Sequence, residues 1–133
     1  MTLSLEQRIE RARLLHREGY NCSQCVVMAF DDVTGLDATK AAEITAAMGA
    51  GMAGQRQICG TLSGTAIVNG IASFKSPKDK PTVYRSTGAL FDQFKAKNGS
   101  IVCGELLTRH DRKPCMQYIE DAITIIDNHL RNS

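Results

Sequence analysis

Apolar residues recur every three or four positions along most of the chain, a spacing typical of amphipathic helices. The first such stretch covers about residues 5–18. Ser4 and Gln7 stand just before and inside it with the spacing of a capping box, and Gly19 is a plausible stop. The sequence therefore predicts a helix here, whose apolar positions are Leu5, Ile9, Ala12 and Leu15.

Capping residues, glycines and prolines mark the ends of further predicted helices along the rest of the chain. Helices are expected over about residues 22–35, 38–48, 58–74, 82–97, 100–107 and 115–130. Glycines and β-branched residues weaken the helix prediction for residues 58–74, where a pair of strands is the alternative. The predicted fold class is all-α, a single-domain bundle of five or six helices over residues 1–133.

Composition and charge narrow the function classes. The formal net charge is only +2 and no basic run stands out, so we expect no nucleic-acid partner. No apolar run approaches the roughly 20 residues that a membrane span needs, so we expect no membrane partner. Residues 1–8 lack the apolar core of a secretory signal, and we therefore expect the protein in the reducing cytoplasm.

The chain has five cysteines, which in that compartment are more often metal ligands or catalytic thiols than disulfides. Four of them fall in predicted first turns of helices, where the positive end of the helix dipole favours thiolate over thiol. Thiolate is both the nucleophile and the metal ligand. The alternative is that the cysteines fill the core as small apolar residues. The four are Cys22, Cys59, Cys103 and Cys115.

Cys22 and Cys25 form a local Cys-x-x-Cys pair, and both sulfurs lie on one face of the predicted helix. A thioredoxin-like site would need a βαβ context, and a zinc ribbon would need a second such pair. The remaining cysteines are spread along the chain but can converge in a bundle. Four thiolates are the ligand set of an iron–sulfur cluster or of a tetrahedral metal ion.

Two other features carry less weight. Gly49, Gly51 and Gly54 have the spacing of a dinucleotide-binding fingerprint, but an Ala-rich helix precedes them where that motif requires a strand. We interpret them as allowing a close backbone approach, with N–H groups directed at a bound cluster or anion. His16 and His129 lie on charged helix faces and are interpreted as solvated.

Four blocks of this sequence, taken in order, resemble the redox-active C_GCAxxG_C_C family. They are Asn21–Gln24, Cys59–Gly64, Gly99–Leu107 and Cys115 before the last helix. The resemblance implies that Cys22, Cys59, Cys103 and Cys115 are the four family cysteines, and an iron–sulfur cluster is implied for some relatives. The central block departs from Gly-Cys-Ala, and Cys25 stands where the family tends to carry a small apolar residue.

We therefore predict electron transfer at a metal centre bound by Cys22, Cys59, Cys103 and Cys115, with an iron–sulfur cluster as the first choice and zinc as the second. One alternative is a metal-free thiol–disulfide protein whose catalytic cysteines are Cys22 and Cys25. Another is a structural zinc domain with an interaction role. A redox partner protein is expected, and a homodimer is left open.

Overall fold

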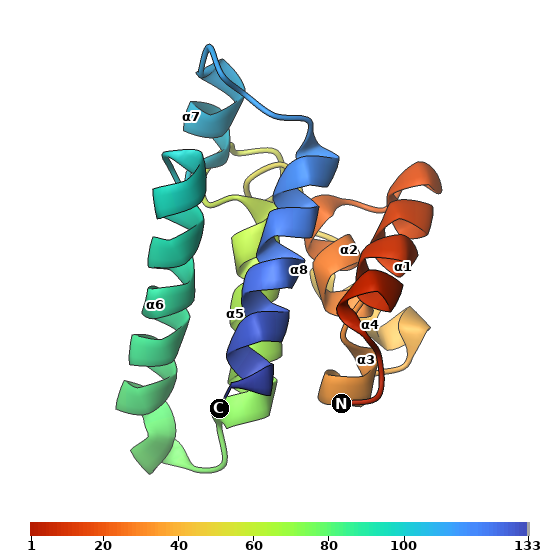
Figure 1. The fold of residues 1–133 in the computed structure, drawn as a ribbon, viewed down its shortest axis with the longest axis vertical. Helices are drawn as coiled ribbons and strands as arrows, with labels where there is room; N and C mark the ends of the chain where they lie inside the picture. The colour runs from red at the N-terminus through yellow and green to blue at the C-terminus, as the bar shows by residue number, and fades with distance from the viewer. Residues whose placement is uncertain (133) are drawn as a thin grey trace.

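The chain is all-α in its computed structural model, which describes residues 1–132 (Figure 1), and the predicted fold class is confirmed. Six of the helices have seven residues or more, and a single 3₁₀ turn (Pro77–Asp79) precedes the longest of them. The α-helices are α1 (Leu5–Arg17), α2 (Cys22–Met28), α3 (Asp31–Thr34), α4 (Ala38–Thr45), α5 (Gly60–Ser73), α6 (Lys80–Asn98), α7 (Cys103–Thr108) and α8 (Cys115–Arg131).

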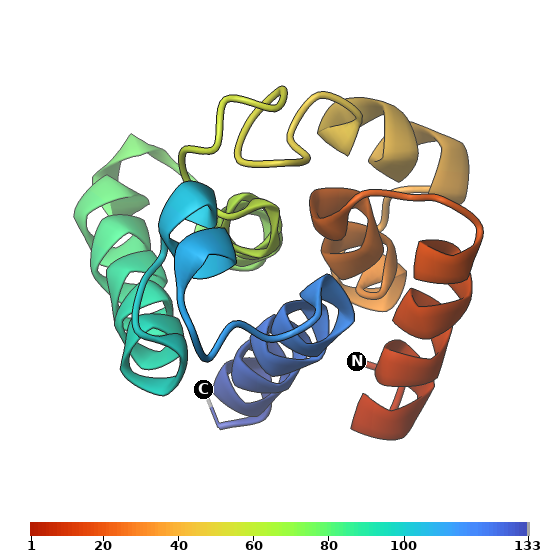
Figure 2. The ribbon, with the colours of Figure 1, turned by 90° about the horizontal axis from the view of Figure 1, so that it is seen from above.

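Helices α5 and α8 lie side by side at the centre and run in the same direction, from the upper to the lower end in Figure 1. Helix α6 returns along one flank, and α1 to α4 pack on the other. One apolar core joins these layers, because α2, α5 and α8 all bury apolar side chains in it. Helices α2, α5 and α8 also begin at the same end of the bundle, where α7 lies above them (Figures 1 and 2).

Local capping chemistry sets several helix starts as the sequence predicted. The Ser4 and Asn21 side chains each accept a hydrogen bond from the backbone N–H three residues later, and Gln7 and Gln24 complete the two capping boxes. Asp37 caps α4 in the simpler way, by accepting from the N–H of Lys40 at 2.7 Å. These bonds satisfy N–H groups that a helix start leaves without an intrahelical partner.

The helix expected over residues 22–35 is interrupted, so that prediction is wrong in part. The N–H groups of Ala29 and Phe30 bond three residues back, to Val26 and Val27, and the turn tightens there. Phe30 leaves helical geometry with φ −120° and lies fully buried against the guanidinium of Arg8, 4.3 Å from its ring centre. The split adds the four-residue helix α3, whereas the six helices of seven residues or more agree with the bundle of five or six that was expected.

Residues 60–73 form a helix, and the alternative of two strands is wrong for them. The only β-type pairing within residues 1–132 is an isolated antiparallel bridge between Ile58 and Val102. Gly60 and Gly64 explain why small residues are needed in α5, because α2 crosses it there at close range. An added Cβ on Gly64 would lie 3.0 Å from the Val26 Cβ. Within residues 1–132, every helix is too short or too polar to cross a bilayer.

Candidate redox site

Four of the five cysteines line one cavity of about 180 Å³. Each stands at the start of a helix: Cys22, Cys103 and Cys115 are the first residues of α2, α7 and α8, and Cys59 is the N-cap of α5. Figures 1 and 2 show these helix starts meeting at one end of the bundle. Residues far apart in the sequence are thus brought together because the bundle places helix N-termini at a common end.

Backbone bonds between two loops hold Cys59 and Cys103 beside each other. The N–H of Cys59 donates to the carbonyl of Ile101 at 2.8 Å, and the N–H of Cys103 donates to the carbonyl of Gln57 at 2.6 Å. These two bonds flank the Ile58–Val102 bridge. The segments carrying the two thiols are therefore joined by their main chains, independently of any ligand.

Close packing of α2 on α5 places Cys22 in the same cavity. A Cβ on Gly60 would lie 3.3 Å from the Cys22 Cβ and 3.2 Å from the Met48 carbonyl oxygen, so only glycine gives this spacing without a shift. The Asn21 amide further fixes the start of α2 by donating to the carbonyls of Thr45 and Ala46, at 3.3 and 3.2 Å. Helix α2 is thus held against both the end of α4 and the start of α5.

Cys22 and Cys115 both line the cavity, and each changes the pKa of the other. The Cys22 thiol lowers the pKa of Cys115 to about 6, against the opposing effect of burial. The positive charges of Arg112 and Arg56, and that of His16 when it is protonated, also favour the Cys115 thiolate. The Cys115 sulfur, together with burial, raises the pKa of Cys22. Cys115 is therefore the thiolate of the pair and Cys22 the protonated partner.

The expectation that helix N-termini would depress the pKa of all four thiols is wrong for two of them. The pKa of Cys22 is raised by the neighbouring Cys115 sulfur and by burial. The pKa of Cys59 is raised chiefly by burial, which outweighs its 3.1 Å contact with the Thr61 hydroxyl. For a buried thiolate, the free-energy cost of desolvation is larger than the stabilisation from the partial positive charge of a helix N-terminus.

Arg56 lines the cavity, and it was not identified as a site residue from the sequence. Its Nη1 lies 3.6 Å from the Cys103 sulfur, and its carbonyl accepts from the N–H of Gly104 at 3.1 Å. His16 is exposed, as expected from the sequence, and it also lines the cavity. The turn at Gly19, between α1 and Cys22, is the sequence signal that could have placed His16 near the site.

The loop between α4 and α5 that carries Arg56 has an unusual backbone. Left-handed conformations of non-glycine residues cost about 1–3 kcal/mol each and persist only where the surroundings impose them. Here the N–H of Ala53 bonds to the carbonyl of Ala47 at 2.8 Å, and that of Gln57 to Gly51 at 2.9 Å. A helix, not a strand, precedes this loop, in agreement with the rejection of a dinucleotide site. The left-handed non-glycine residues are Ala50, Met52, Ala53 and Arg56.

Cys25 lies away from the cavity. It is fully buried in the core, and its sulfur contacts the carbonyl oxygen of Tyr20 at 3.7 Å. Burial raises its pKa to about 12. The structure thus brings together Cys22, Cys59, Cys103 and Cys115, and separates Cys25 from them.

The arrangement of the thiols bears on which metal group they fit. Within residues 1–132, no three His, Cys, Asp or Glu side chains are placed to hold one metal ion. Zinc and an iron–sulfur cluster both take a four-cysteine donor set, so metal binding by these thiols stays a prediction.

A sequence profile described as "Putative redox-active protein (C_GCAxxG_C_C)" matches residues 20–129. The chain belongs to the C_GCAxxG_C_C family. The matched range contains all four cavity cysteines of this C_GCAxxG_C_C protein and ends within α8. No curated protein and no solved structure matches the chain.

Proposed function

We propose that this protein exchanges electrons through Cys22 and Cys115 as a dithiol–disulfide couple. The observation that carries the proposal is that two free, half-buried thiols, at the starts of α2 and α8, line the same accessible cavity and change each other's pKa. A thiolate beside a second thiol is the arrangement that thiol–disulfide exchange requires. Cys115 is half-buried rather than enclosed, so a reactant can reach it.

The chemistry follows from the protonation states of the pair. The Cys115 thiolate attacks a disulfide of the redox partner, forms a mixed disulfide and releases one partner thiolate. Cys22 then attacks the Cys115 sulfur, and the second partner sulfur leaves. The Cys22 proton passes to a released thiolate. Two protein thiols are thereby oxidised to one disulfide, and one partner disulfide is reduced to two thiols.

This proposal changes the pairing considered from the sequence alone. Cys25 was the expected partner of Cys22 because the two are three residues apart on one helix. Cys25 instead points its sulfur at the Tyr20 carbonyl within the core. Its raised pKa of about 12 keeps it protonated and unreactive. Cys115 takes its place in the proposed couple.

The test is a redox titration of the metal-free protein in buffers of varied dithiol-to-disulfide ratio, with alkylation of free thiols and disulfide mapping by mass spectrometry. We expect one disulfide, between Cys22 and Cys115. The variants Cys22→Ala and Cys115→Ala should lose it, whereas Cys25→Ala is the matched control and should retain it. A disulfide confined to Cys59 and Cys103, or none at all, would contradict the proposal.

A second candidate is an iron–sulfur cluster held by Cys22, Cys59, Cys103 and Cys115. All four thiols line one cavity, and this supports it. When bound, such a cluster supplies one-electron transfer. The chain's own residues would hold it between helix starts, and the contact from Arg56 to Cys103 would stabilise negative charge on sulfur.

Anaerobic purification with iron and sulfide analysis separates the two candidates. If the cluster is present, the purified protein should absorb visible light and contain stoichiometric iron. Each of the four variants in which a cavity cysteine is replaced by serine should lose both properties. Cys25→Ser is again the matched control, because its side chain lies in the core. Colourless protein without iron after anaerobic reconstitution, combined with a Cys22–Cys115 disulfide, would leave the thiol couple alone.

A further inference from the structure

Two arginines beside the cysteine cavity have no carboxylate partner. Arg56 lines the cavity, with its Nη1 3.6 Å from the Cys103 sulfur, and Arg112 donates to the carbonyl of Leu107, another lining residue, at 3.4 Å. Both arginines are exposed, as is His16, which also lines the cavity. None of them forms an ion pair with any described side chain. Most other arginines do: Arg8, Arg11, Arg13, Arg17, Arg109 and Arg131 each lie within 4.0 Å of an Asp or Glu.

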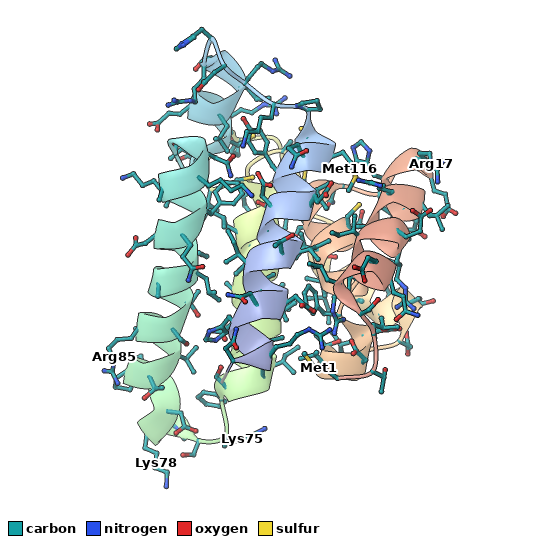
Figure 3. All side chains as sticks on the ribbon, in the orientation of Figure 1. Met1, Arg17, Lys75, Lys78, Arg85 and Met116 are labelled. Carbon is teal, nitrogen blue, oxygen red and sulfur yellow. The ribbon has the colours of Figure 1, made fainter. Side chains whose placement is uncertain are left out.

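Only one arginine besides Arg56 and Arg112 lacks such a partner in the described part of the chain. That residue is Arg85, which bonds only to the Thr82 hydroxyl at 3.3 Å. Figure 3 shows Arg85 projecting from the lower half of α6, whereas Met116, next to Cys115, lies towards the upper end. Two of the three arginines without a carboxylate partner are therefore near the cysteine cavity, where they leave net positive charge beside the thiolate.

Cavity size limits what this charge can attract. The volume of about 180 Å³ is smaller than the roughly 300 Å³ at which pockets for drug-sized ligands begin. Its walls include the apolar and aromatic side chains of Leu106, Tyr20 and Tyr118, with His16 and Arg56 among the lining residues. Such a site suits a compact molecule with an apolar or sulfur-containing centre and a negative end.

We propose that the substrate of the Cys22–Cys115 couple is a small anionic disulfide, whose carboxylate is attracted by Arg56 and Arg112. This inference rests on the proposed thiol–disulfide function. The Cys115 thiolate attacks one sulfur of the substrate and releases the first carboxylated thiolate. Cys22 then closes the protein disulfide and releases the second, and its proton goes to one of the two. One substrate disulfide is reduced for each protein disulfide formed.

Three disulfides of similar size and different charge test the inference. They are dithiodiglycolate, which is anionic, bis(2-hydroxyethyl) disulfide, which is neutral, and cystamine, which is cationic. The measurement is the second-order rate of oxidation of the reduced, metal-free protein at low ionic strength, with the product disulfide mapped by mass spectrometry. The informative quantity is the ratio of the anionic to the cationic rate in each variant, because intrinsic disulfide reactivity cancels between variants.

We expect Arg56→Gln combined with Arg112→Gln to lower this ratio about tenfold, as for loss of electrostatic steering. Arg112→Gln alone should lower it about threefold, and it keeps the Arg56 contact with Cys103 intact. Arg85→Gln is the matched control and should keep the wild-type ratio. Loss of the two arginine charges also reduces the thiolate fraction of Cys115. This lowers the rate of reaction with all three disulfides by the same factor, so the ratio of the anionic to the cationic rate is unchanged.

The outcomes separate the inference from the function on which it rests. An unchanged ratio in the double variant, with a Cys22–Cys115 disulfide still formed, would overturn the substrate class and leave the redox couple standing. Failure of all three disulfides to produce a Cys22–Cys115 bond would overturn both. Added salt should also reduce the wild-type ratio, because it screens exposed charges.

Discussion

Cys22 at the start of α2 and Cys115 at the start of α8 line the same cavity, and each changes the pKa of the other. The two residues occupy similar positions in their helices but differ in protonation. Both thiols are half-buried, but the charges of Arg112 and Arg56 favour the Cys115 thiolate, whereas Cys115 and burial raise the pKa of Cys22. The difference between the two thiols therefore comes from their tertiary surroundings.

Alkylation of Cys115 should follow its pKa of about 6. Thiolate is the reactive form, so the rate at Cys115 should rise with pH and reach half its maximum near pH 6. Cys22 should stay slow over the same range, because its pKa is raised. Timed alkylation of the reduced, metal-free protein, resolved by site with mass spectrometry, measures both rates. Equal rates at the two cysteines near pH 6 would contradict the assignment.

Replacing the proton donor tests the cause of this difference. Cys22→Ala removes the thiol that lowers the pKa of Cys115, and the midpoint for Cys115 alkylation should rise by about 1–2 pH units, the value of a hydrogen bond to a charged group. Cys22→Ser retains a donor and is the matched control, with a smaller rise expected. The same midpoint in all three proteins would show that the cations, not Cys22, stabilise the thiolate.

Cys25→Ala should reduce stability by about 1 kcal/mol, because it removes a fully buried sulfur from the core. Its pH dependence has a definite sign. Burial raises the pKa of Cys25 from 9.0 to about 12, so its contribution to stability is complete below pH 9 and falls between pH 9 and 12. Urea unfolding should therefore show a smaller alkaline loss of stability in Cys25→Ala than in the wild type. Identical pH profiles would indicate that Cys25 is exposed.

The parts of this fold that sequence predicts well depend on local contacts. Ser4, Asn21 and Asp37 cap their helices through bonds to the next turn, so the pattern alone identifies them. The break after Met28 was missed because it follows from long-range packing. Phe30 leaves the helix at a point where Arg8, from α1, covers its ring.

The same division applies to the site. The position of each cysteine at a helix start is local information, and it allowed the gathering of four thiols to be expected. Which thiol pairs with which depends on how α2 and α8 meet, and no spacing in the sequence encodes the Cys22–Cys115 contact. The contact from Arg56 to Cys103 depends likewise on the left-handed loop that carries Arg56. Metal binding by the four cysteines stays a prediction.

Gly64→Ala should destabilise the protein by about 1–3 kcal/mol, because the new Cβ would lie 3.0 Å from the Val26 Cβ and force α2 away from α5. Gly70→Ala, in the same helix, is the matched control. A Cβ on Gly70 meets nothing within 4 Å, and alanine should stabilise the helix by about 0.5–1 kcal/mol. Urea unfolding gives both values. Equal effects of the two substitutions would contradict the close approach of α2 and α5.

Arg8 is the centre of a buried ion network at the end of the molecule away from the cavity. Its side chain is fully buried and lies 2.6 Å from Asp32 and 3.0 Å from Asp127, whose side chains are 7% and 5% exposed. It also donates to the carbonyl of Ala29 at 2.9 Å. The guanidinium thus ties α1 to α8 and to the segment that joins α2 to α3.

Arg8→Met should cost about 3–5 kcal/mol, because it leaves the buried Asp32 carboxylate without its cation and Asp127 with Arg131 alone. Arg11→Met is the matched control on the same helix: its pair with Asp31 is exposed, and its loss should cost less than about 1 kcal/mol.

Burial opposes ionisation of Asp32, but hydrogen bonds from Arg8 and from two backbone N–H groups hold its pKa well below the ordinary 3.8. The stabilisation from Asp32 is therefore present above pH 4 and is lost as the pH falls below it. Urea unfolding at pH 7 and pH 3 should show a large gap between wild type and Arg8→Met at pH 7 and a smaller gap at pH 3. A gap that does not change with pH would mean that Arg8 stabilises the fold by packing on Phe30 rather than by its charge.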